Sequence, residues 1–84
     1  MASESKIIAD IDGIVGSYPA WTIGVTDDPA HRRIEHGNPV TWYQWDADSE
    51  QIARNVEAYF LRKGMKGGSG GGGRADYVYI FLNR

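Results

Sequence analysis

The stretch WTIGVTDDPAHRRIEH, residues 21–36, decides the fold because it contains a strand, a turn and the start of a helix. Trp21, Ile23 and Val25 alternate with smaller or more polar residues. A period of two is typical of a strand with one buried face. The pattern therefore predicts a half-buried strand over residues 21–26.

A helix is predicted directly after this strand. Asp28 followed by Pro29 is typical of an N-cap and a first helical position, because the aspartate oxygen accepts a free N–H and proline has none to leave unpaired. Gly37 and Pro39 end the helical pattern. We therefore expect a short helix over residues 29–36.

The two sides of this helix differ in chemistry. Arg32 and His36 are four residues apart, so they share one side. Ala30 and Ile34 lie on the other side and are expected to face the core. The spacing predicts that a guanidinium and an imidazole project together beside the end of a strand.

These residues resemble a motif of the GIY-YIG nuclease family, in which a Tyr-Ile-Gly strand leads through a turn into a helix that carries arginine and histidine. Thr22-Ile23-Gly24 takes the place of the Tyr-Ile-Gly triplet. Arg32 follows eight residues after Gly24, and His36 follows at the family's spacing without a gap. The resemblance implies a small domain that cleaves nucleic acid with the help of a divalent metal.

The rest of the chain completes a single α+β domain over residues 1–84. Helical periodicity recurs twice outside the central stretch, and apolar alternation recurs twice. The longest helix is expected to begin after the cap Asp48, with Gln51 at the capping-box position. We expect a three-stranded, mainly antiparallel sheet (about 21–26, 40–45 and 77–82) flanked by three helices (about 4–15, 29–36 and 49–63).

Glu57 lies at the border of the apolar stripe of the longest helix. Spacing alone leaves two interpretations open: a carboxylate that points into a cleft at the sheet edge, or a surface ion pair with Arg54. The resemblance matches Glu57 to the glutamate that binds the metal in the family, and it matches Glu50 less well.

The family pattern is broken at its first strand, which carries Gly-Ile-Tyr. Tyr18 lies only four residues before Thr22, too close for a hairpin partner. Thr22 itself replaces a tyrosine, and its hydroxyl is shorter and less acidic than a phenol. The segment DYVYIF near the C-terminus resembles the missing strand moved by circular permutation. In that case Tyr77 or Tyr79 supplies the missing phenol, and this strand pairs with residues 21–26.

Residues 64–73, GMKGGSGGGG, form a glycine-rich run. It is not a phosphate-binding loop of the Gly-Lys-Ser/Thr kind, because that motif enters a helix and this run leaves one. A flexible linker and a mobile flap beside the site both fit the composition.

Bulk composition limits the classes of function. The 84 residues, 42% of them hydrophobic, suffice for one small core. The absence of cysteine excludes a disulfide framework and suits a reducing compartment, so we expect a cytoplasmic protein. No basic segment precedes a long apolar run, so neither a signal peptide nor a membrane partner is expected. A net charge of −2 counts against tight, unaided binding of nucleic acid, although a local basic patch is compatible with it.

One class of function is enzymatic, namely a metal-dependent endonuclease or phosphodiesterase. The resemblance implies that Glu57 binds Mg²⁺ or Mn²⁺ through a hard oxygen. Arg32 would hold the phosphate oxygens, and His36 would act as a general base or hold the water. The candidate site residues are Thr22, Arg32, His36, Glu57, Tyr77 and Tyr79.

A second class is a non-catalytic module that kept the scaffold and lost the chemistry. It would bind a protein or a short nucleic acid through the aromatic residues of 40–45 or the glycine flap, although those aromatics lack interleaved Lys or Arg and equally suit ordinary packing. In this interpretation His36 is a helix-end cation and Arg32 a surface charge. A third interpretation is an unrelated α+β domain whose role the fold does not indicate.

Overall fold

The computed structural model describes residues 1–67 and 75–83, so most of the expected linker or flap lies outside the described residues. Within them the chain follows an α+β order, as expected. The elements are α1 (Glu4–Ile14), the 3-10 turn η1 (Tyr18–Ala20), β1 (Trp21–Thr26), α2 (Pro29–Glu35), β2 (Trp42–Asp46), α3 (Glu50–Lys63), β3 (Lys66–Gly67) and β4 (Tyr77–Leu82).

The described strands form one mixed sheet in the order β2-β4-β1-β3. Strand β4 runs antiparallel to both β1 and β2, so the expected pairing of residues 77–82 with residues 21–26 is present. The expected count of three strands was one too few, because β3 pairs parallel to β1. Its two residues are too short for any alternation to show in the sequence. Strand β2 begins at Trp42, two residues later than expected, because Val40 and Thr41 form a bend before it.

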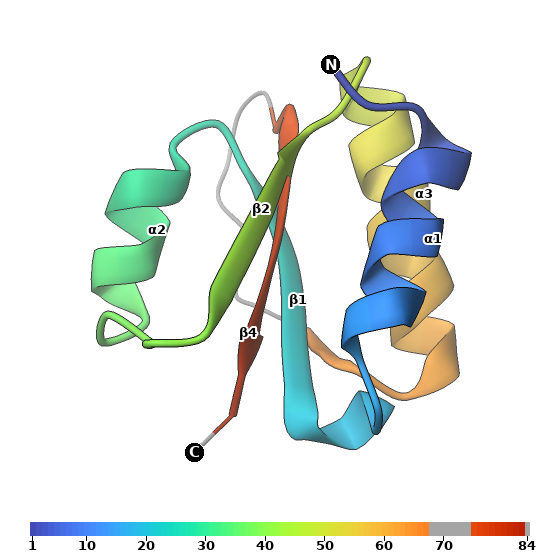
Figure 1. The fold of residues 1–84 in the computed structure, drawn as a ribbon. Coiled ribbons are helices and arrows are strands. Elements are labelled where there is room, and N and C mark those ends of the chain that lie inside the picture. The colour runs from blue at the N-terminus through green and yellow to red at the C-terminus, as the bar shows by residue number, and fades with distance from the viewer. Residues whose placement is uncertain (68–74, 84) are drawn as a thin grey trace.

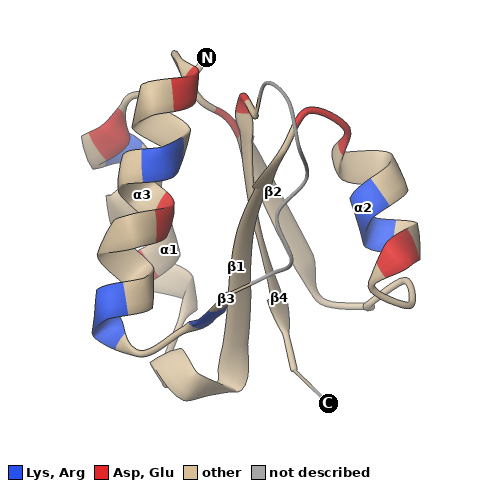
Figure 2. Cartoon of the chain, turned by 180° about the vertical axis from the view of Figure 1, so that it is seen from behind, with Lys and Arg blue, Asp and Glu red and all other residues tan. Residues whose placement is uncertain are grey.

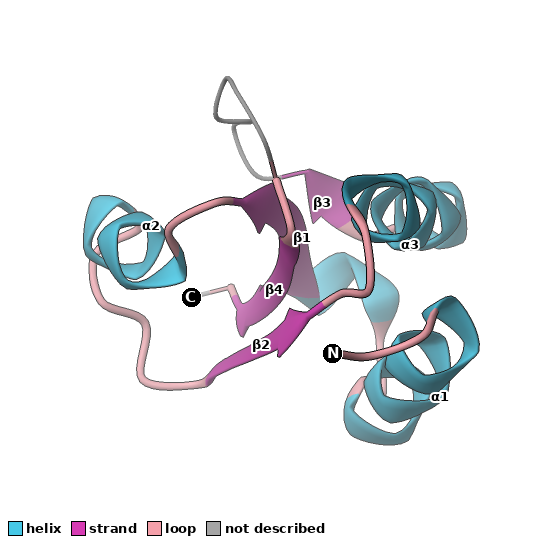
Figure 3. Ribbon diagram, turned by 90° about the horizontal axis from the view of Figure 1, so that it is seen from above, coloured by secondary structure: helices cyan, strands magenta, loops and turns pink. Residues whose placement is uncertain are grey.

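The sheet separates α2 from the other two helices (Figure 1). Seen from above, α2 lies on one side and α1 with α3 on the other (Figure 3). The apolar face of the sheet packs against α1 and α3, as the alternation of β1 and β4 requires. This core contains Ile7, Ile11, Ile23, Ala53, Val56, Phe60, Val78 and Ile80.

Helix α2 faces the sheet with its polar side, which corrects the expected orientation. Ile34 is 62% exposed and Ala30 is exposed as well, so neither joins the core. Arg33 instead donates two hydrogen bonds, of 3.0 and 3.3 Å, to the carbonyl of Pro39. His36, at the C-cap, bonds to a tyrosine of β4. These polar contacts of Arg33 and His36 orient the helix.

The N-cap of α3 is Ser49, one residue after the expected Asp48. The Ser49 hydroxyl accepts a hydrogen bond from the Ile52 N–H at 3.2 Å. Gln51 donates to a side chain one turn later and takes no part in the cap. Gly64 ends the helix in the left-handed region, with φ of 112°, where glycine is favoured.

Charged side chains gather unevenly on the surface (Figure 2). Acidic residues follow the ends of β1 and β2, whereas basic residues lie on α2 and near the junction of α3 with β3 (Arg32, Arg33, Arg62, Lys63 and Lys66). Local basic surface therefore coexists with a net charge of −2. Of the helices described, none has both the length and the apolar character needed to cross a membrane.

Candidate functional site

The candidate site lies on the sheet face that α2 covers, where Gly24 of β1 is directly opposite Tyr79 of β4. A β-carbon at residue 24 would overlap the hydroxyl and ring of Tyr79. The Tyr79 side chain is fully buried. The glycine of the Thr-Ile-Gly triplet therefore provides the space in which the phenol of the neighbouring strand lies.

His36 contacts this phenol from α2. Its Nε2 lies 3.0 Å from Tyr79 Oη, and the two ring centroids are 5.6 Å apart. Burial lowers the pKa of the His36 imidazole, and the charge of Arg32 lowers it further. Burial raises the pKa of the Tyr79 phenol above its usual value of 10.0. Both groups are therefore neutral near pH 7, and this pairing is satisfied when the Tyr79 hydroxyl donates to Nε2.

Arg32 lies on the same side of α2 as His36, as the spacing predicted. Its side chain is only 15% exposed, and Nη1 lies 3.0 Å from Oε1 of Glu35. The guanidinium charge opposes the effect of burial on Tyr79, because it lowers the pKa of the phenol. The charge of Arg32 thus lowers the pKa of both His36 and Tyr79, while its Nη1 binds the Glu35 carboxylate.

Glu57 acts on the same phenol from α3. Its negative charge raises the pKa of Tyr79. Burial raises the pKa of Glu57 itself, against a smaller lowering by Arg54. The alternative interpretation, a surface pair between Glu57 and Arg54, does not appear among the described ion pairs, and Arg54 Nη2 lies 3.2 Å from Glu50 Oε2 instead. Glu57 is thus a partly buried carboxylate within electrostatic range of Tyr79.

The other two predicted residues lie on the same face but take no part in the His36–Tyr79 contact. The Thr22 hydroxyl donates to the side-chain carbonyl of Asn83 and is buried. Tyr77 lies at the start of β4 and is partly buried, and none of the described hydrogen bonds or ring contacts joins it to His36. Of the two tyrosines proposed for the missing phenol, the structure brings Tyr79 to α2.

An aromatic layer that the sequence analysis did not assign to the site surrounds the pair. Trp42 stacks on Tyr79 with ring centroids 4.7 Å apart and planes 7° apart. The Phe81 ring stacks with both Trp42 and Tyr79, with centroid distances of 5.8 and 6.3 Å, and its centroid lies 4.8 Å from that of the His36 ring. The alternation of side chains along the strands is the sequence signal that could have predicted this layer, because Trp42, Tyr79 and Phe81 fall on one face of the sheet.

The residues present fit one mode of metal binding and exclude another. No group of three or more His, Asp or Glu side chains suited to hold a metal occurs among the described residues, so they form no complete protein cage. Mg²⁺ commonly binds one or two carboxylates and completes its shell with water and substrate phosphate. Glu57, which has no ion-pair partner in the described part of the chain, fits this second mode.

Comparisons with known proteins identify no family for this chain. No protein-family model matches the chain, and no curated protein or solved structure is significantly similar to it.

Proposed function

We propose that this chain is a divergent, circularly permuted GIY-YIG-like domain that binds and cleaves phosphodiesters of nucleic acid with a divalent metal. The observation that carries the proposal is the 3.0 Å contact between His36 Nε2 and Tyr79 Oη beside the space left by Gly24. The charges of Arg32 and Glu57, which act on the pKa of Tyr79, support it. The antiparallel pairing of β4 with β1 also supports it, because a relocated Gly-Ile-Tyr strand requires that neighbour. The proposal includes a cytoplasmic location for the protein.

Each residue has a role that suits its chemistry. Arg32 would release Glu35 and hold the non-bridging phosphate oxygens, for which a planar guanidinium is well shaped. Glu57 would bind Mg²⁺ or Mn²⁺ through a carboxylate oxygen. When bound, the metal would polarise the phosphate and stabilise the leaving oxygen.

The His36–Tyr79 pair would move the proton of the attacking water. As the water oxygen bonds to phosphorus, its proton passes to Tyr79 Oη, and Tyr79 passes its own proton to His36 Nε2. The bond from phosphorus to the leaving oxygen breaks, and that oxygen takes up a proton from solvent. Neutral His36 is the acceptor, and its lowered pKa keeps it neutral at pH 7.

Access of water and phosphate to Tyr79 requires a local opening that leaves His36 in contact with Tyr79, because Tyr79 is fully buried and His36 takes its proton. None of the residues of α2 is fully buried. Residues of α2 that do not contact Tyr79 can therefore shift without exposing a fully buried side chain of their own, as in segments that open locally.

A non-catalytic module is the second candidate. Two observations favour it: the buried Tyr79 hydroxyl already has a partner in His36, and the Thr22 hydroxyl is bonded to Asn83. In this case these two polar contacts stabilise the scaffold, and the protein or nucleic-acid partner binds elsewhere.

The two candidates differ in a cleavage assay with labelled single-stranded, duplex and branched DNA and RNA, with and without Mn²⁺. The enzyme proposal predicts metal-dependent cleavage that Arg32→Ala and Glu57→Ala each abolish. Arg54→Ala and Glu50→Ala, which disrupt an exposed pair on α3, serve as matched controls and should retain activity. Absence of cleavage from the folded wild-type chain on all substrates would favour the module.

A further inference from the structure

Strand β2 forms one outer edge of the sheet. The Leu82 N–H donates to the Thr41 carbonyl at 3.3 Å, so the odd-numbered residues of this segment bond toward β4. The Ala2 N–H donates to the Asp46 carbonyl at 2.7 Å from the opposite side, so the even-numbered residues point outward.

The outward groups of Trp42 and Gln44 are open. Each residue presents one N–H and one C=O away from β4, and no backbone partner for them occurs among the described residues. We call Thr41–Trp45 the β2 edge. An open edge pairs readily with another strand unless charge, proline or a bulge prevents it. The β2 edge, TWYQW, contains no charged residue and no proline.

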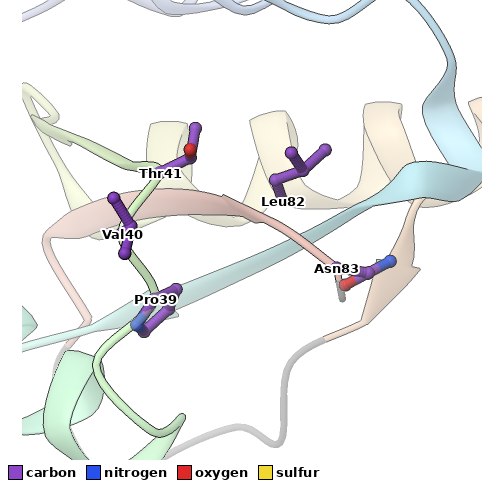
Figure 4. A pocket seen from close by; sticks show the side chains of 5 residues that line it. All are labelled: Pro39, Val40, Thr41, Leu82 and Asn83. Atoms are coloured by element: carbon purple, nitrogen blue, oxygen red, sulfur yellow. The ribbon is translucent and has the colours of Figure 1, made fainter.

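Apolar side chains beside the β2 edge are also exposed. Tyr43 is 42% exposed, with its ring centroid 6.2 Å from that of Trp21, and Val40 is 91% exposed. A pocket of about 280 Å³ lies at the start of β2, lined by Pro39, Val40, Thr41, Leu82 and Asn83 (Figure 4). An added strand would cover apolar surface as well as satisfy backbone groups.

We propose that the β2 edge binds the β2 edge of a second copy of this chain in antiparallel orientation, with the two-fold axis at Tyr43. In this register Trp42 of each copy is opposite Gln44 of the other, so all four open groups of each strand are hydrogen-bonded. The two copies form one continuous sheet, and both α2 layers lie on the same side of it.

The hydrogen-bond register and the neutral charge of the β2 edge are both self-complementary, which favours a second copy as the occupant. Pairing about a two-fold axis places residue 43 against itself, so a charge there would oppose an identical charge. Tyr43 is neutral, and so are its two neighbours on each side. The first charged residue, Asp46, already has its carbonyl bonded to Ala2 and lies at the end of the segment. This inference is independent of the proposed reaction.

Sedimentation velocity of the full chain, from micromolar to millimolar concentration, tests the proposal. We expect a concentration-dependent dimer. Tyr43→Lys and Tyr43→Glu should each weaken dimerisation by about tenfold or more, because two like charges then meet at the axis. An equimolar mixture of the two variants should dimerise again. Leu61→Lys, a substitution at a residue with 40% exposure on α3, is the control that should leave the dimer unchanged.

Three results would overturn the proposal. The first is a wild-type chain that stays monomeric over the whole concentration range. In that case the β2 edge would be open to a partner of different sequence. The second is a wild-type dimer that Tyr43→Lys does not weaken. The third is a mixture of the two charge variants that stays monomeric although circular dichroism shows both folded.

Discussion

At the scale of single residues, Gly24 links the fold to the proposed site. The absence of a side chain on β1 leaves the space that the Tyr79 phenol occupies. From there the phenol meets His36 and lies within range of two opposite charges. A single missing methyl group is thus a condition for the polar contact between β4 and α2.

Gly24→Ala tests this dependence. The added methyl would displace a buried aromatic ring, and such overpacking costs about 1–3 kcal/mol. We expect urea denaturation to show that loss of stability, together with loss of the His36–Tyr79 contact in NMR spectra. Gly13→Ala is the control, because no atom lies within 4 Å of its added β-carbon and α1 should gain slightly in stability. Equal stability of Gly24→Ala and the wild type would contradict the packing described here.

Glu57→Gln tests the burial of the proposed metal ligand through the pH dependence of stability. Burial raises the pKa of Glu57 above 4.5, so the folded chain binds this proton more tightly than the unfolded chain. The resulting stability is complete below about pH 4.5 and is lost as pH rises through the folded pKa. Glu57→Gln should therefore be more stable than the wild type at pH 7, with the difference shrinking toward pH 4 in thermal unfolding. A variant that is less stable at pH 7 would show that Glu57 is stabilised by an interaction that outweighs burial.

At the scale of elements, the strongly amphipathic α1 and α3 were predictable, and α2 was predictable only in extent. Apolar periodicity reports a buried face, and α3 buries Ala53, Val56 and Phe60 as that pattern predicts. Helix α2 has one large apolar residue, Ile34, which is exposed. Its orientation depends on a tyrosine far along the chain, and no local pattern contains that information.

The cap of α3 provides a local test of how one residue sets an element boundary. Ser49→Ala removes the hydroxyl that accepts from the Ile52 N–H, and loss of such a cap costs about 0.5–2 kcal/mol. Asp48→Ala should cost clearly less, because Asp48 precedes the cap. Chemical denaturation of both variants compares them directly. A larger loss of stability for Asp48→Ala than for Ser49→Ala would indicate that Asp48 is the effective N-cap.

At the scale of the whole molecule, the topology follows from the pairing of the first and last described strands, β1 and β4. Strand β4 lies between β1 and β2, although it is the last strand of the chain. Alternation predicted that residues 77–82 form a strand buried on both faces, and the family resemblance predicted its neighbour β1. The parallel addition of β3 was not predictable, because two residues beside a glycine run show no strand pattern. The choice of Tyr79 over Tyr77 required the register, which the sequence does not specify.

The central claim is that charges from α2 and α3, those of Arg32 and Glu57, both act on the Tyr79 phenol, and an NMR pH titration of Tyr79 in selectively labelled protein tests it most directly. We predict that Tyr79 titrates above its usual value of 10.0 in the wild type, that Glu57→Gln lowers this pKa, and that Arg32→Ala raises it. A Tyr79 pKa that neither substitution changes would contradict the account, because the two charges would then not meet at this phenol.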